Sequence, residues 1–163
     1  MPNWCSNVAF ISHENADELN KIVTELEKGE DAQLFESLVP NPSGEWNYEW
    51  SVDNWGTKWD ASIYEFELEP AGLRINFDTA WSPPIEFYNK LTELGYQVEA
   101  FYYEESMDFA GQYVDGDHHH FGGLTEMTAS ELEDTLPTKL DEIYGISAYA
   151  RDLENEESEE NDD

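Results

Sequence analysis

The feature that most constrains the fold is a strict alternation of apolar and polar residues between residues 64 and 78. The apolar positions of this alternation are Tyr64, Phe66, Leu68, Leu73, Ile75 and Phe77. The two halves are separated by Pro70-Ala71-Gly72, a turn sequence. A period of two places alternate side chains on opposite faces of a strand. The segment therefore predicts a β-hairpin with one buried and one solvated face, as found in antiparallel sheets.

Strand and helix patterns surround this hairpin in a regular order. They predict a strand at 4–12, a helix at 15–29, the hairpin, a helix at 82–95 and a strand at 96–103. This β-α-β-β-α-β order is that of a ferredoxin-like split βαβ fold. Further strands at 107–114 and 117–124, and a helix near 130–144, form a C-terminal extension. We expect one α+β domain over residues 1–150, with an antiparallel sheet and helices on one of its faces.

The connection at residues 41–59 is long and contains four tryptophans, Trp46, Trp50, Trp55 and Trp59. Loops of this length are usually functional or disordered, and this aromatic content argues against disorder. Two interpretations are open. The rings fill the open face of the sheet, or some of them anchor an interface, where tryptophan is enriched.

The net charge of −31 excludes several classes of function. Residues 152–163 contain eight acids and no base, so thirty acids and seven bases remain in the first 151 residues, a net charge of −23. Such a surface repels nucleic acids and anionic membranes and attracts basic proteins. We expect a partner protein with a basic surface, and a disordered acidic tail at 151–163.

The sequence also indicates a compartment. No apolar run approaches the roughly 18 residues of a membrane helix, the N-terminus has no secretory pattern, and Cys5 is the single cysteine. We therefore expect a cytoplasmic protein without disulfides, with Cys5 buried in the first strand.

Four motifs together resemble a known family. They are Met1-Pro2-Asn3-Trp4-Cys5-Ser6-Asn7, Trp55-Gly56-Thr57-Lys58-Trp59-Asp60, the run from Phe77 to Pro84 (FDTAWSPP), and the run from Tyr103 to Gly111 (YEESMDFAG). In this order they resemble the YubB-like ferredoxin-like domain family of phages and conjugative plasmids, over roughly residues 1–125. The resemblance implies a ferredoxin-like fold, a mobile-element origin and a host-cell location. It implies no established activity and no catalytic residue.

The motif residues are the candidate functional site. The candidate partner-binding residues are Trp55, Trp59, Asp60, Asp78, Trp81, Glu104, Glu105 and Asp108. Aromatic rings beside paired carboxylates also occur in glycoside hydrolases, where one acid donates a proton and the other attacks or activates water. The simpler interpretation is that these carboxylates cap turns and accept backbone N–H groups.

His118 and His120 would share one face of a strand, and Asp115 or Asp117 would then complete a metal site. Two histidines fall short of the three or four ligands of a zinc site, and adjacent histidines on a hairpin are usually solvated. We expect no metal and no cofactor.

Three functions fit these observations. The first is a non-catalytic accessory protein that binds a host nucleic-acid-binding or defence enzyme, with inhibition by DNA mimicry as one form of this function. About 40 Å of DNA duplex carries about 24 charges. This number is comparable to the net charge of −23 on the first 151 residues. A mimic would still need those acids on one face, or would need to form a dimer. The alternative is a carboxylate-dependent hydrolase acting on sugars or nucleotides. The third is salt adaptation, in which the acidity serves solvation.

Overall fold

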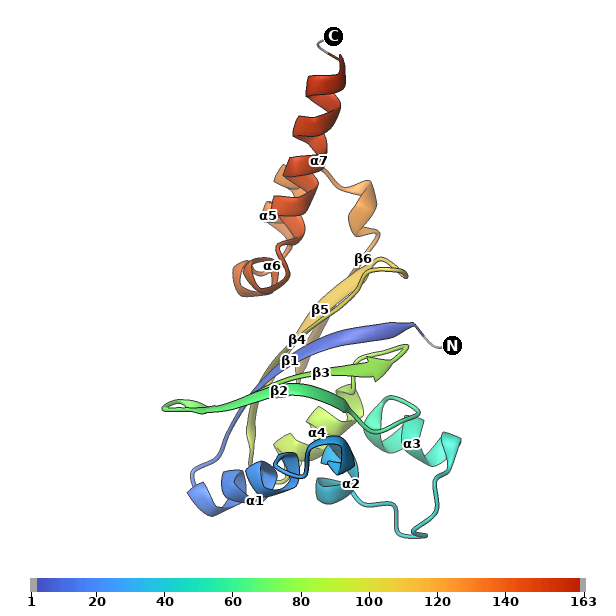
Figure 1. The fold of residues 1–163 in the computed structure, drawn as a ribbon, viewed down its shortest axis with the longest axis vertical. Helices are drawn as coiled ribbons and strands as arrows, with labels where there is room; N and C mark the ends of the chain where they lie inside the picture. The colour runs from blue at the N-terminus through green and yellow to red at the C-terminus, as the bar shows by residue number, and fades with distance from the viewer. Residues whose placement is uncertain (1–2, 162–163) are drawn as a thin grey trace.

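A single antiparallel sheet of six strands organises the protein, in the order β2-β3-β1-β4-β5-β6 (Figure 1). This computed structural model describes residues 3–161. The strands are β1 (Trp4–Ser12), β2 (Ser62–Glu69), β3 (Gly72–Ala80), β4 (Gln97–Glu104), β5 (Phe109–Val114) and β6 (Asp117–Gly122). Each neighbouring pair is antiparallel.

Seven α-helices accompany the sheet within residues 3–161. They are α1 (Ala16–Leu26), α2 (Leu34–Leu38), α3 (Tyr48–Trp55), α4 (Ile85–Glu93), α5 (Ala129–Thr135), α6 (Thr138–Tyr144) and α7 (Ile146–Asn161). The elements β1-α1-β2-β3-α4-β4 form the split βαβ unit, with strand order β2-β3-β1-β4. The predicted ferredoxin-like α+β class is therefore confirmed, and β5 and β6 extend the sheet beyond β4.

The predicted hairpin is present, but its alternation holds in only one strand. Leu73, Ile75 and Phe77 in β3 are buried as expected. In β2 a bulge between Ile63 and Glu65 shifts the register, so Tyr64 is 58% exposed. Leu68 is 54% exposed because it lies near the hairpin end, which extends past the helices (Figure 1).

Helices cover both faces of the sheet. The helices α1 to α4 lie on one face and α5 to α7 on the other (Figure 1). Successive side chains of β1 point to opposite faces of the sheet and so contribute to both cores. Ile11 belongs to the core under α1, α2 and α4, and Phe10 packs against the core of α5 to α7. The predicted single covered face thus describes α1 to α4, and the C-terminal extension adds the second layer.

The acidic C-terminal segment differs from its prediction. Disorder was expected over 151–163, whereas α7 continues as a helix through Asn161, and Asp162 and Asp163 lie outside the described residues. Two contacts with α5 hold the start of this segment. Arg151 pairs with Glu133, and a Glu154 Oε1 accepts the backbone N–H of Ala129. Nowhere in residues 3–161 is a helix long and apolar enough to cross a bilayer.

Candidate functional site

Exposed large apolar side chains gather where the segment around α3 meets the start of β1 and the end of β3. Six of them make up what we call the aromatic surface: Trp4, Trp46, Tyr48, Val52, Trp59 and Trp81. Their exposed fractions run from 36% to 60%. The rings of Trp4 and Trp59 lie 6.1 Å apart, centroid to centroid, and the Trp46 Nε1 donates to the Lys58 carbonyl at 2.7 Å. The surface is therefore continuous across separate elements.

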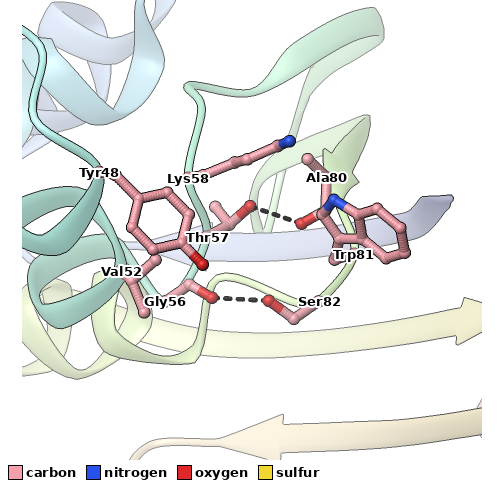
Figure 2. Close-up of a pocket in the computed structure, with 8 residues that line it drawn as sticks. All are labelled: Tyr48, Val52, Gly56, Thr57, Lys58, Ala80, Trp81 and Ser82. Carbon is pink, nitrogen blue, oxygen red and sulfur yellow. Dashed lines mark hydrogen bonds between the residues drawn. The ribbon is translucent and has the colours of Figure 1, made fainter. Parts of the chain in front are cut away.

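Two of the sequence motifs are joined here by side-chain to backbone hydrogen bonds. The Thr57 hydroxyl donates to the Ala80 carbonyl at 2.8 Å, and the Ser82 hydroxyl donates to the Gly56 carbonyl at 2.7 Å (Figure 2). Gly56 ends α3 with φ of 86°, and a Cβ there would lie 3.0 Å from the Ile85 backbone nitrogen. Only glycine meets both demands, so the chain turns sharply and brings residues 57–59 against the end of β3.

The helix predicted at 82–95 begins later than expected. It begins at Ile85, with Pro84 at its N-cap position. Ser82 lies two residues before this N-cap position, and its hydroxyl donates to the Gly56 carbonyl.

Trp81 adopts a backbone conformation that non-glycine residues rarely take. Its φ is 70°, and its N–H donates to the Asn3 carbonyl at 2.8 Å. The ring remains 48% exposed. Strain of this kind concentrates at functional sites, so the exposed ring is a functional candidate.

Lys58 is the cation of the aromatic surface. Its Nζ lies 4.1 Å from the Trp59 ring centroid and 5.9 Å from that of Trp81. Five of the seven bases form ion pairs with carboxylates within residues 3–161, and Lys58 forms none there. An ammonium group is thus held between indoles in a very acidic protein.

Two pockets open beside the aromatic surface. The lysine pocket, about 280 Å³, lies between Tyr48 and Val52 on α3 and Trp81 after β3, and Lys58 extends toward Trp81 (Figure 2). The second pocket, which we call the acidic pocket, measures about 250 Å³. Its lining includes the carboxylates of Glu36, Glu45 and Asp60 and the rings of Trp46, Trp55 and Trp59.

Of the predicted site residues, Trp59 and Trp81 lie together on the aromatic surface, and Trp55 and Asp60 have structural roles. Trp55 is only 4% exposed and packs on Phe35 in the core. The Asp60 carboxylate accepts the backbone N–H groups of Phe35, Glu36 and Ala61 at 2.7–3.0 Å. Burial raises the pKa of the Asp60 carboxyl.

The remaining predicted carboxylates lie apart from these tryptophans or bind their own turns. Glu104 is buried and accepts the N–H groups of Ser106 and Met107. Asp108 accepts the N–H and hydroxyl of Thr125. Asp78 is half-buried on β3, where burial raises its pKa. Glu105 is exposed and lines a separate shallow pocket near Trp4.

The two histidines share a strand face as expected. The Tyr102 hydroxyl lies 2.6 Å from His118 Nε2 and 2.8 Å from His120 Nδ1. The suggested third ligand is not beside them, because Asp115 accepts the Val98 N–H and Asp117 alternates to the opposite face. Across residues 3–161 no group of three or more His, Cys, Asp or Glu side chains is placed to hold a metal.

Several residues of the aromatic surface were not selected from the sequence. Trp4 and Lys58 lie within the quoted motifs, and Tyr48 and Val52 lie on α3, which was expected to be loop. The available signals were Asn47, whose side chain accepts the Trp50 N–H as an N-cap, and Gly56 as the helix end.

The fold and this surface together define a ferredoxin-like domain protein with an exposed aromatic site beside α3 and the start of β1. Residues 54–161 match a family model described as the ferredoxin-like domain in Api92-like protein, and the chain belongs to this family. Among solved structures, the protein Api92 from Yersinia pseudotuberculosis is similar, with 16% identity and a TM-score of 0.41 over 54% of this chain. That alignment spans 38% of the Api92 chain. The comparison with curated proteins finds no match.

Proposed function

We propose that this chain is a non-catalytic, acidic protein-binding accessory protein of a phage or other mobile element, and that it contacts its partner through the aromatic surface. The observation that carries the proposal is the continuous set of six exposed large apolar side chains around Lys58. Hot spots of protein interfaces are enriched in tryptophan, tyrosine and arginine, and this surface has four tryptophans and one tyrosine. A cluster of this kind on a highly charged protein marks a binding site.

The net charge of −31 favours a partner with a basic surface, such as a nucleic-acid-binding host enzyme that the protein inhibits. Exposed acids occur on α1 in one helical layer and on α5 and α7 in the other, for example Asp17, Glu131 and Glu156. A field present on both sides favours general electrostatic steering over one-sided imitation of a duplex.

The hydrolase alternative rests on the acidic pocket, where tryptophans and carboxylates meet. Both Asp60 oxygens accept backbone N–H groups, and both Glu36 oxygens lie 3.2 Å from the Asn41 nitrogen. A general acid needs to be free to give its proton to a leaving group. The hydrogen bonds therefore support a binding role for this pocket over catalysis.

The test compares Trp59→Ala with Tyr149→Ala, an equally drastic change at an exposed tyrosine on α7 (61% exposed). Each full-length variant is immobilised and exposed to bacterial lysate at low salt. We expect Trp59→Ala to retain at least about tenfold less of the partner than the native protein does. Tyr149→Ala should retain as much of the partner as the native protein.

Equal retention by Trp59→Ala and the native protein would contradict the proposal. Duplex DNA added as a competitor identifies the surface of the partner, because release by DNA places the contact at a nucleic-acid-binding groove.

A further inference from the structure

The acidic pocket contains a polar group that the folded chain leaves without a partner. Ser51, on α3, is only 1% exposed, and its Oγ has no hydrogen-bond partner within residues 3–161. Ser51 also lines the acidic pocket. Buried hydroxyls are nearly always hydrogen-bonded, so the unpaired hydroxyl of a residue that lines a pocket favours a hydrogen-bonding ligand in that pocket.

The charge of the pocket indicates what that group is. Three carboxylates line it, Glu36, Glu45 and Asp60, and no Lys or Arg of the described residues does. Burial raises the pKa of the Asp60 carboxyl, so its charge is poorly solvated. Each carboxylate offers about four acceptor sites, and the backbone hydrogen bonds of Asp60 and Glu36 leave some of these open.

The tryptophans that line the acidic pocket also favour a cationic ligand. Indole faces attract cations within about 6 Å of the ring centroid, and Trp46, Trp55 and Trp59 line this pocket. The protein already shows the interaction, since Trp59 receives the Lys58 ammonium at 4.1 Å.

The size of the pocket limits the ligand. Sites for drug-sized molecules run from about 300 to 1,000 Å³, and this pocket has about 250 Å³. It has the scale of one side chain or one small ion.

We propose that the acidic pocket receives one cationic side chain, a lysine ammonium or an arginine guanidinium, from the basic partner. The carboxylates of Glu36, Glu45 and Asp60 neutralise it, the indoles of Trp46 and Trp59 contact its hydrophobic stem, and Ser51 Oγ accepts one of its N–H groups. This inference rests on the proposed function and names the group by which the partner is anchored.

The test titrates the full-length protein with N-acetyl-argininamide and N-acetyl-lysinamide, which need no identified partner. The neutral isostere N-acetyl-citrullinamide and glucose serve as the uncharged probes. Tryptophan indole N–H signals in a nitrogen–proton NMR spectrum report binding at the pocket. We expect saturable shifts with the two cationic probes and none with the uncharged probes.

Matched variants distinguish binding of the cationic probes at the pocket from their general attraction to an acidic protein. Glu45→Gln and Glu49→Gln remove one exposed charge each, and only Glu45 lines the pocket. We expect Glu45→Gln to weaken binding of the cationic probes about tenfold, the value of one charge-assisted hydrogen bond, and Glu49→Gln to leave it unchanged. Ser51→Ala should weaken probe binding while raising the urea midpoint, because it removes an unsatisfied buried group.

Equal weakening by Glu45→Gln and Glu49→Gln would overturn the inference, as would binding of glucose or citrullinamide in place of the cations. If the cationic probes fail to bind while Trp59→Ala still loses the partner, this inference is wrong and the proposed function stands. If the probes bind while Trp59→Ala keeps the partner, the pocket is real and the proposed function is wrong.

Discussion

Trp81 has a large exposed side chain at a position whose backbone conformation favours glycine. Its φ of 70° is a left-handed conformation that costs a residue with a Cβ roughly 1–2 kcal/mol. The hydrogen bond from its N–H to Asn3 and those made by the flanking residues hold it there. Glycine would fit this backbone better, so the indole itself must account for the residue at this position.

We expect Trp81→Gly to be more stable than Trp81→Ala by about 1 kcal/mol. Both variants lose the same ring, and only glycine takes the positive φ without strain. At an ordinary position the order is reversed, because glycine loses more entropy on folding. Urea unfolding of the two variants measures the difference, and an alanine variant of equal or greater stability would show that the backbone relaxes when the ring is removed.

At the scale of elements, the pairing of β4, β5 and β6 creates a polar cluster on a sheet edge. Tyr102 crosses Gly111, where a Cβ would lie 2.2 Å from the tyrosine hydroxyl oxygen, and reaches His118 and His120 on β6. The hydroxyl has one proton, so it donates to one imidazole and accepts from the other. At least one of the two rings must therefore be neutral.

This cluster predicts a pH dependence of stability. Burial lowers the pKa of His118, with the neighbouring histidines adding to the effect. Between that lowered pKa and the unfolded value of about 6.5, the unfolded chain binds more protons than the folded one. The free energy of unfolding should therefore fall as pH decreases below about 6.5.

The measurement is urea unfolding at several pH values between 7.5 and 5.5. We expect His118→Gln to show a smaller decrease than the native protein, and His119→Gln, which changes the opposite face of β6, to follow the native protein. Parallel curves for all three proteins would place the pH dependence elsewhere.

For the whole molecule, the dominant property is a negative field on both helical layers. Such a field accelerates encounter with a basic partner and has less influence on the contacts that hold the complex. The Debye length falls from about 10 Å at 0.1 M salt to about 3 Å at 1 M, so this steering is screened by salt.

We expect the association rate with the captured partner to fall at least about tenfold between 0.05 and 0.5 M NaCl, while the dissociation rate changes much less. Surface plasmon resonance on the purified partner measures both rates. A salt effect confined to dissociation would mean that charge acts within the interface, and a rate of association indifferent to salt would contradict steering.

The sequence by itself determined the β-α-β-β-α-β order, because the periods of two and 3.6 are local and appear in short windows. It also indicated the motifs that form the site, and two residues within them, Trp59 and Trp81, lie on the aromatic surface. Those motifs contain the signals of the turns, above all Gly56, whose positive φ is a local requirement, although the close approach of Ile85 to it is set by the tertiary structure.

Only the tertiary structure decided which face each element covers and which tryptophans remain exposed. Trp55 and Trp59 are four residues apart in one motif, yet one lies in the core at 4% exposure and the other on the surface at 40%. The bulge in β2, the second helical layer and the pairing of Asp60 with the start of α2 likewise depend on contacts between distant segments. Burial is a property of what packs against a side chain, and that partner is chosen by the fold as a whole.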